Sequence, residues 1–406
     1  MKPAISEIDL KFMRAALQLA RRGYGATSPN PMVGAMLVKR GRVIGRGWHR
    51  RAGEPHAEIE ALRNATGHGL SPRRATLYVT LEPCSTYGRT PPCTEAIIRA
   101  GIRRVVIGAQ DTNPQHAGKG FEILQRADLE VKRLDAGDGT KSTNPALLRR
   151  QQKLAADCTR LNEIFNHWIV RRTPFVTVKA AMTLDGRIAT ASGESKWITG
   201  EAARAEGMKL RLGHDAILVG VNTVLADNPS LTVRTAPGIS ANPPHILRRI
   251  VLDAQARTPL TAKLISDGAA SLTTLVVSKD APARRVAALA KKVRVLVAPL
   301  VKKVSGDKKP RVDLPWLLKT LGGENVTSLL VEGGGEVNAS FLLGGLAQRI
   351  AFFYAPKILG GRDAHKAVAG EGIDRLEDVL NLREVAWRRV GGDLMLTARV
   401  QDIPVG

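Results

Sequence analysis

The sequence has few cysteines and few aromatic residues, and it lacks long apolar runs. Three cysteines among 406 residues give no disulfide framework, so we expect a reducing compartment. Aromatic residues make up 4% of the chain, which leaves few side chains on which single-stranded bases could stack. No apolar run approaches the length of a membrane-spanning helix. These absences argue against a disulfide-stabilised secreted module and against a membrane-spanning protein.

The first residues carry a helical pattern. Leu10, Met13, Leu17 and Ala20 recur at helical spacing, with basic residues between them, and Ser6 stands where a helix cap is expected. This pattern predicts an amphipathic helix of a folded domain, because a signal peptide needs a continuous apolar segment. We therefore expect a cytoplasmic protein.

Acidic residues are scarce, and the formal net charge is +24. Ten lysines and arginines stand between residues 284 and 311 against one acid, Asp307, and aliphatic residues rather than aromatics separate them. Either a solvated basic surface or a polyanionic partner such as nucleic acid accounts for this excess. We favour the solvated surface, with phosphate-bearing small molecules as part of the cause, and expect no specific nucleic-acid partner.

The length indicates two domains, and strands alternate with helices in both halves, as in layered α/β proteins. In the first half we expect strands over 33–39, 42–47, 75–80 and 104–108, and helices over 56–64 and 94–100. In the second half we expect helices over 201–212 and from Asn338, and a buried, largely parallel sheet. Its expected strands are 175–180, 216–220, 249–253, 274–278, 294–297 and 328–332.

Small polar residues cluster over 135–145 and interrupt the alternation. We therefore expect a first domain over 1–145, a linker helix over 146–172 and a second domain over 173–406. The segment 302–311 is expected to be a flexible basic insertion.

His56, Cys84 and Cys93 form a candidate zinc site in the first domain. One imidazole and two thiolates suit a tetrahedral zinc that keeps a fourth position for water, whose pKa the metal lowers. Glu58, two residues after His56, is suited to move the proton without binding the metal. The alternatives are a surface His–Glu pair and two buried thiols that act as small apolar residues. The His-x-Glu pair followed by Pro83-Cys84 resembles the signature of zinc nucleobase deaminases.

The surrounding sequence resembles the deaminase domain of the bifunctional riboflavin-biosynthesis deaminase–reductases. The stretches that carry the resemblance are Ser28–Gly34, Thr80–Ser85, Gly88–Cys93, Asn113-Pro114 and Gly118–Gly120. Two positions depart from the family pattern, which usually has histidine at Thr86 and proline at Thr112. Neither departure touches the expected metal ligands.

The second half resembles the reductase domain of the same family. The matching stretches are Lys179–Arg187, Gly193–Thr199, Gly220–Pro229 and Leu231–Arg234, and the triplet Gly333–Gly335 follows an expected strand. A glycine turn between a strand and a helix forms an anion site from backbone N–H groups. At Ala254 the family usually has serine or threonine.

The resemblance implies a cytidine-deaminase-like three-layer α/β/α domain followed by a dihydrofolate-reductase-like α/β domain. The implied cofactors are Zn²⁺ and NADPH. The implied activities are deamination of 2,5-diamino-6-(5-phosphoribosylamino)pyrimidin-4(3H)-one and reduction of the ribosyl group to ribityl. We expect a small phosphorylated pyrimidine as substrate, no membrane partner and a homo-oligomer.

The resemblance also implies binding residues. The implied NADPH contacts are Ala181, Trp197, Thr223, Asp227, Gly334, Gly335, Glu336, Val337, Asn338, Ala339 and Ser340. The implied substrate contacts are Asn30, Arg89, Lys179, Ser195, Arg211, Leu231, Arg234 and Glu332. For Arg89 an exposed loop position is the alternative, for Arg211 a salt-bridged helix position, and for Trp197 a core position.

The strongest rival interpretation is a nucleic-acid deaminase that acts on tRNA adenosine, which the net charge of +24 would favour. The nine-residue spacing between Cys84 and Cys93 and the reductase-like second half argue against it.

Overall fold

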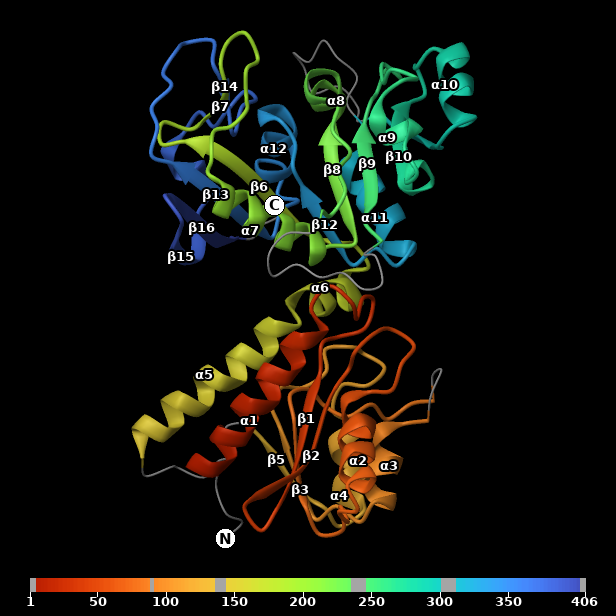
Figure 1. Cartoon of the computed structure of the whole chain (residues 1–406), viewed down its shortest axis with the longest axis vertical. Helices are drawn as coiled ribbons and strands as arrows, with labels where there is room; N and C mark the ends of the chain where they lie inside the picture. Colours follow the sequence, from red (N-terminus) through yellow and green to blue (C-terminus); the bar gives the residue numbers. More distant parts are fainter. Residues whose placement is uncertain (1–4, 88–90, 136–143, 235–245, 301–311, 402–406) are drawn as a thin grey trace. The chain divides into compact units, whose positions relative to one another are not determined.

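The computed structural model describes residues 5–87, 91–135, 144–234, 246–300 and 312–401. The chain forms two compact units, Met1–Arg172 and Thr173–Gly406, and each contains its own sheet (Figure 1). The expected basic insertion over 302–311 lies outside the described residues. No helix in the described ranges is long and apolar enough to cross a membrane.

The first unit contains a five-stranded sheet in the order β2-β1-β3-β4-β5. Its strands are β1 (Gly34–Lys39), β2 (Arg42–Trp48), β3 (Thr76–Val79), β4 (Arg104–Ile107) and β5 (Glu130–Arg133). β1 pairs antiparallel with β2 and β3, whereas β3, β4 and β5 run parallel to one another. The strands predicted from the sequence are confirmed within two residues at each end, and β5 was not predicted.

Helices cover both faces of this sheet. They are α1 (Glu7–Ala20), α2 (Ala57–Gly67), α3 (Cys93–Arg99), α4 (Lys119–Arg126), α5 (Pro145–Leu161) and α6 (Glu163–Arg171). Successive residues of a strand point to opposite faces. Accordingly Ala35 and Leu37 pack with residues of α2, α3 and α4, while Met36 and Val38 pack with residues of α1 and α5. The three-layer α/β/α arrangement predicted for this domain is confirmed.

The capping of α1 follows the expectation from the sequence. The Ser6 hydroxyl accepts a hydrogen bond from the Asp9 backbone at 3.2 Å, and the Asp9 carboxylate accepts one from the Ser6 backbone at 2.8 Å. The same carboxylate pairs with Arg104 of β4 at 2.6 Å. The first helix is therefore fixed to the sheet by an ion pair at its capped end.

The segment expected as a single linker helix forms two helices, α5 and α6. Leu154, Ala155 and Cys158 of α5 are buried in the same cluster as the apolar face of α1. This helix therefore contributes to the core of the first unit.

The second unit contains a nine-stranded sheet in the order β11-β10-β9-β8-β12-β6-β13-β16-β15. These strands are β6 (Phe175–Thr183), β8 (Ala216–Gly220), β9 (Arg248–Leu252), β10 (Thr273–Ser278), β11 (Arg294–Ala298), β12 (Ser328–Val331), β13 (Arg349–Ala355), β15 (Leu382–Val390) and β16 (Asp393–Val400). A separate pair consists of β7 (Arg187–Ala189) and β14 (His365–Lys366). The strands from β11 to β13 run parallel, whereas β16 and β15 are antiparallel at one edge.

The helices of this unit are α7 (Glu201–Leu212), α8 (Val221–Asp227), α9 (Lys263–Ser266), α10 (Ala283–Ala290), α11 (Leu314–Gly323) and α12 (Gly335–Leu342). Residues of α11 and α12 pack on one face of the parallel strands, and residues of α8, α9 and α10 pack on the other. The prediction of a buried, largely parallel sheet is confirmed. The expected start of a helix at Asn338 is wrong by three residues, because α12 already begins at Gly335, inside the glycine triplet.

The strand order reverses at β12. The chain proceeds outward through β8, β9, β10 and β11, and then returns to insert β12 between β8 and β6. In open sheets of this kind, ligands bind outside the carboxyl ends of the strands at the point of reversal. This places Glu332 and the Gly333–Gly335 turn, which follow β12, at the expected position of a binding crevice.

Candidate active sites

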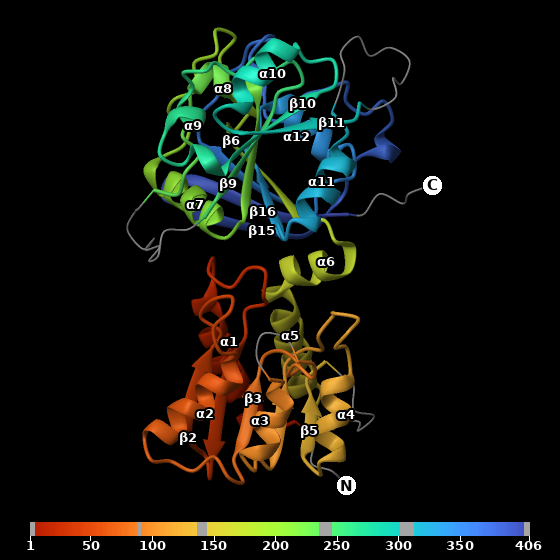
Figure 2. The ribbon, with the colours of Figure 1, turned by 90° about the vertical axis from the view of Figure 1, so that its right-hand side faces the viewer.

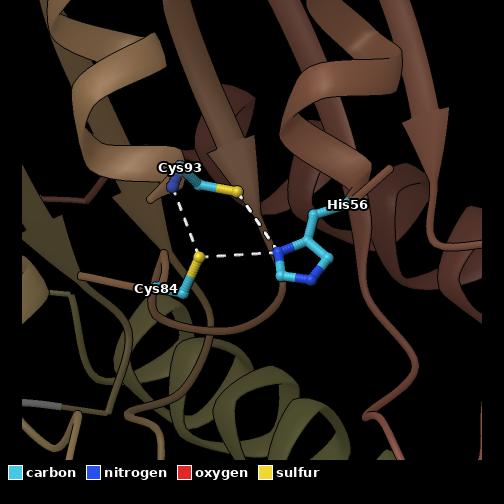
Figure 3. Close-up of side chains that lie close together, drawn as sticks. All are labelled: His56, Cys84 and Cys93. Atoms are coloured by element: carbon cyan, nitrogen blue, oxygen red, sulfur yellow. Dashed lines mark hydrogen bonds between the residues drawn. The ribbon is translucent and has the colours of Figure 1, made fainter. Parts of the chain in front are cut away.

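His56, Cys84 and Cys93 lie together in the first unit, as the sequence predicts. His56 is the N-cap of α2, Cys93 is the first residue of α3, and Cys84 lies on the turn that follows β3 (Figure 3). The Nδ1 atom of His56 is 3.5 Å from the Cys84 sulfur and 3.4 Å from the Cys93 sulfur. One ligand atom from each residue lies within 4.8 Å of the others, a spacing that a single ion can bridge. The donor set, one imidazole and two thiols, fits zinc.

The electrostatics of this cluster favour a thiolate at Cys84. The Cys93 backbone donates to the Cys84 sulfur at 3.3 Å, and the positive ends of α2 and α3 both face the cluster. Hydrogen bonding with the Cys93 side chain, with a further contribution from His56, lowers the pKa of Cys84 to about 4. The cluster therefore stabilises the thiolate of Cys84, which is the form that binds metals, whereas the hydrogen bond with Cys84 and burial raise the pKa of Cys93.

Glu58 lies in the first turn of α2, and only 3% of the residue is exposed. Burial raises the pKa of its carboxyl group to about 7. Among the described residues the metal-type cluster consists of His56, Cys84 and Cys93, and Glu58 is not a member. The carboxyl group lies close to the cluster, since the charges of His56 and Cys84 and a hydrogen bond with Cys93 act on its pKa.

Asn30 is held by His49, a residue that the sequence analysis missed. The His49 Nδ1 atom lies 3.1 Å from the Pro55 carbonyl oxygen, which can only accept, so this nitrogen carries the proton. The other ring nitrogen then accepts from the Asn30 amide at 3.2 Å. The His49 ring also meets His56 edge to face, with centroids 5.3 Å apart. This chain of contacts fixes the Asn30 amide so that its carbonyl oxygen is left to accept from a ligand.

Glu82 positions the loop between β4 and α4, and it too was missed. Its buried carboxylate accepts backbone hydrogen bonds from Asp111 at 3.2 Å, Gly118 at 3.1 Å and Gly120 at 2.9 Å. Gly120 lies so close that a Cβ atom there would be 2.5 Å from the Pro83 carbonyl oxygen. The loop is therefore held against the turn that carries Cys84. No spacing in the sequence indicates this role, because the donors are backbone groups some 30 residues away.

The two departures from the family pattern have defined surroundings. The Thr86 hydroxyl lies 3.3 Å from the His116 ring, so an imidazole from another segment stands beside the position where the family usually has histidine. Thr112 donates to the Asn166 side chain at 3.0 Å. Arg89 lies outside the described residues.

Lys179, Arg211 and Glu332 meet in the second unit at the reversal of the strand order. The Arg211 guanidinium donates to both oxygens of Glu332, at 3.0 and 2.9 Å, and the Lys179 Nζ atom is 3.7 Å from Glu332. Burial alone would raise the pKa of Glu332, but the charges of Arg211 and Lys179 outweigh it and hold the pKa at about 2. Glu332 is therefore an ionised acceptor. Arg211 also donates to the Thr232 carbonyl oxygen at 3.0 Å, which ties the segment of Leu231 and Arg234 to this group.

The Gly333–Gly335 turn has two packed glycines and one open one. A Cβ atom on Gly333 would lie 2.5 Å from the Val337 side chain, and one on Gly335 would lie 2.3 Å from the Lys366 carbonyl oxygen. Gly334 has nothing within 4 Å, and it is the N-cap of α12. The turn therefore leaves room for an anionic ligand at the helix N-terminus.

The remaining residues expected to contact NADPH differ in their exposure and in their contacts. Trp197 is 61% exposed, with Arg204 stacked at 4.6 Å, so it is not a core residue. Asp227 accepts from Ser195 at 3.4 Å and pairs with Lys196 at 3.5 Å. Asn338 is fully buried, and its amide donates to the Ala367 carbonyl oxygen. On α12, Glu336 and Ser340 are joined by a hydrogen bond from the Ser340 hydroxyl, and Val337 and Ala339 pack against the core.

The other expected residues lie on several different elements. Ala181 is part of β6, and Thr223 is part of α8. Leu231 is buried, whereas Arg234 is exposed and has no ion-pair partner in the described part of the chain. Ala254 packs against the core, and its carbonyl oxygen accepts from the Ser278 hydroxyl at 2.8 Å.

Comparisons with known proteins agree with this division into two units. Residues 6–109 match the family described as the cytidine and deoxycytidylate deaminase zinc-binding region. Residues 174–396 match the RibD C-terminal domain. The riboflavin biosynthesis protein RibD of Bacillus amyloliquefaciens is 40% identical over 393 residues, which are 96% of this chain and 96% of that protein.

Solved structures of similar proteins cover the whole chain. RibD of Acinetobacter baumannii has a TM-score of 0.79 at 34% identity and covers 97% of this chain and 99% of its own. A Thermotoga maritima protein has a TM-score of 0.76 at 31% identity, with coverages of 97% and 99%. Its name is diaminohydroxyphosphoribosylaminopyrimidine deaminase/5-amino-6-(5-phosphoribosylamino)uracil reductase.

Fold and sites together define a two-part enzyme with a cytidine-deaminase-like domain of the zinc-binding type and a dihydrofolate-reductase-like domain. The chain belongs to the RibD family and is a bifunctional deaminase and reductase of riboflavin biosynthesis. The rival interpretation as a nucleic-acid deaminase is not favoured, because relatives with both domains match nearly the full length.

The substitution Glu82→Gln should loosen the loop over 111–120 without removing the metal ligands. Three backbone N–H groups now donate to the carboxylate, and in the variant one of its oxygens would be replaced by an NH₂ group that cannot accept. We therefore expect the loop to be destabilised by about 2 kcal/mol. Hydrogen exchange of the Asp111, Gly118 and Gly120 amides should become faster, and ammonia release should fall. Glu122→Gln, which alters an exposed pair with Arg126 in the same unit, serves as the control. Unchanged exchange across this loop would contradict the positioning role.

Proposed function

We propose that the first unit removes the 2-amino group of 2,5-diamino-6-(5-phosphoribosylamino)pyrimidin-4(3H)-one as ammonia. The observation that carries this proposal is the cluster of His56, Cys84 and Cys93 beside the buried Glu58. These three side chains would hold zinc, which supplies an activated water when bound. The name of the similar Thermotoga maritima protein supports the choice of substrate.

Glu58 moves the protons in this proposal. Its carboxylate accepts a proton from the attacking water and returns it to the departing amine, so that one water enters and one ammonia leaves. Asn30, oriented by His49, accepts a hydrogen bond from the pyrimidine. Arg89 is proposed to contact the substrate phosphate.

The second unit is proposed to reduce the ribosyl group with NADPH, which supplies a hydride when bound. The open Gly334 turn at the N-terminus of α12 fits a phosphate of the cofactor. Further proposed cofactor contacts are Ala181, Trp197, Thr223, Asp227 and Gly335–Ser340. On the substrate side, Lys179 and Glu332 orient the sugar near its C1 atom. Arg234, which is exposed and unpaired among the described residues, binds the 5-phosphate.

Arg211 is proposed to assist at the same phosphate, although its pair with Glu332 uses much of its guanidinium. Three of its five N–H groups already have acceptors, which leaves two donors for a ligand. Ser195 and Leu231 complete the proposed substrate contacts. Both reactions are proposed to take place in the cytoplasm, where the cysteines form no disulfide.

The zinc assignment predicts a sharp division among the three cysteines. Cys84→Ala and Cys93→Ala should each lose most of the bound zinc, because either change removes one of three protein ligands. Cys158→Ala should keep about one zinc per chain, because Cys158 is buried against the other face of the sheet. Metal analysis of the purified proteins measures this. Full zinc in either of the first two variants would remove that residue from the site.

The two active sites predict a crossed pattern of losses. Glu58→Gln should keep zinc and lower ammonia release by about 10²- to 10⁴-fold, because an amide cannot accept and return a proton. The same variant, given deaminated substrate, should oxidise NADPH at close to the parent rate. Arg234→Ala should lower kcat/KM of reduction about 10- to 100-fold through loss of a charge-assisted contact, and leave ammonia release intact.

Each of these two variants serves as the control for the other.

The cofactor preference is tested by replacing NADPH with NADH. We expect a higher kcat/KM with NADPH. Loss of both activities in either folded variant, or equal rates with both cofactors, would contradict the proposal as drawn.

We also propose that the chain forms homo-oligomers through the β15 edge. β15 is the outermost strand of the nine-stranded sheet, and Val385 and Trp387 on it are 51% and 58% exposed. A second copy of the chain would cover this edge. Trp387→Lys should weaken association, whereas Val297→Lys on the opposite edge strand β11 should not. Sedimentation analysis measures both, and a monomeric parent protein at micromolar concentration would overturn the proposal.

A further inference from the structure

A cavity of about 930 Å³ lies in the first unit beside β2, the edge strand of its sheet. Figure 2 shows this edge of the sheet, where α2 lies along β2. The cavity is lined from α1, from β2 with the residues around it, and from α2. The lining residues are Ala15, Gln18, Leu19, Arg22, Met36, Arg46, Trp48, Arg50, Glu60, Arg63, Asn64 and His68. Its volume lies in the range of pockets that hold small ligands.

Positive charge dominates this lining. Four arginines face one acid, Glu60, which pairs with Arg50 at 3.3 Å and with Arg63 at 3.7 Å. The other two, Arg22 and Arg46, have no acidic partner within the described ranges. All four arginines are exposed, and an anion bound among them would gain favourable charge pairs.

The apolar part of the lining has a defined shape. The Trp48 ring is contacted by the guanidinium groups of Arg22 at 5.0 Å and of Arg50 at 4.6 Å. Leu19 and Met36 form the floor of the cavity and are themselves largely buried in the core. The Arg46 backbone N–H of the edge strand β2 donates to the Asn64 side chain at 3.0 Å. This N–H group is therefore not available to pair with a strand of another chain. The edge is therefore not arranged for strand addition, and its stacked arginines present flat, charged surfaces.

The cavity is distinct from the deaminase centre. None of His56, Glu58, Cys84 and Cys93 lines it. Its residues do adjoin that centre, because Trp48 and Arg50 flank His49, which contacts both Asn30 and His56.

We propose that this cavity binds a nucleotide that carries two or three phosphates. Guanidinium groups bind phosphates with paired, charge-assisted hydrogen bonds, and they also stack on flat rings. An excess of three positive charges matches the charge of such a ligand, and the guanidinium planes stacked on Trp48 offer flat surfaces to a heterocyclic base. The volume accommodates one molecule of this size.

The test is calorimetric titration of the zinc-loaded full chain with ATP at 150 mM salt. We expect that Arg46→Ala/Arg63→Ala will weaken binding in this cavity at least tenfold. Arg99→Ala/Arg126→Ala removes the same charge from exposed positions of the same unit, and should leave binding within twofold. Any ATP held by the reductase unit is common to both variants and cancels in the comparison. Ammonia release should stay at the parent level in both, which separates this proposal from the deaminase assignment.

Two further titrations test the ligand class. Inorganic triphosphate should bind more weakly than ATP, since it lacks the base; equal affinity would show a polyphosphate site and overturn the proposal. A 20-nucleotide RNA should not compete strongly. If RNA displaced ATP through the same two arginines, the cavity would be part of a nucleic-acid surface and the proposal would be wrong. Equal loss of ATP binding in both arginine variants would reduce the effect to general charge and would also overturn it.

Discussion

The first unit depends on two helix N-termini that converge on one cluster of side chains. His56 caps α2, Cys93 opens α3, and Cys84 approaches from the turn after β3. The other residues of the deaminase centre are positioned around these two helix ends. Glu58 lies in the first turn of α2, Glu82 holds the loop after β4 against the Cys84 turn, and Asn30 contacts His49, which in turn contacts His56. Because both helix dipoles favour negative charge at this point, the fold stabilises the thiolate of Cys84, whose pKa is lowered.

In the second unit the order of the strands in the sheet brings the charged residues together. Its charged residues lie on separate strands and helices, and the insertion of β12 between β6 and β8 brings them together. Glu332 gains two cationic partners there, and the glycine turn that follows allows α12 to begin against the carboxyl end of β12. The protein thus joins two sites that arise by different means, one from helix ends and one from strand order.

The sequence predicted the parts of the fold whose signal is local. The helix Glu201–Leu212 and the strand Ala216–Gly220 were predicted with the bounds that the structure has, because a helical period and a short apolar run identify them. The start of α12 was placed too late, because glycines indicate a turn and conceal the helix behind them. β13, β15 and β16 were not predicted, and with them the antiparallel edge of the sheet was missed.

The site residues, too, were predicted where their signal is local in the sequence and missed where it is not. The metal-type cluster was predicted because its residue types and spacing resemble a known signature, and the structure brings all three side chains together. His49 and Glu82 were missed, because their roles rest on backbone groups and on a neighbouring ring that only the fold brings close. The alternative of a salt-bridged position for Arg211 proved accurate as a description of its contacts, while exposure excludes the core position considered for Trp197.

The late arrival of β12 also constrains how the chain can fold during synthesis. β6 is made first in its unit, yet among the described strands its neighbours in the sheet are β12 and β13, which come after residue 327. The strands β8 to β11 can pair as soon as they emerge, but β6, whose nine residues are largely buried in the final structure, must wait unpaired. An apolar strand without a partner is prone to aggregate. The ribosome therefore carries an incomplete reductase sheet for most of the synthesis of the second unit, while the deaminase unit, whose strands all precede residue 134, can already be complete.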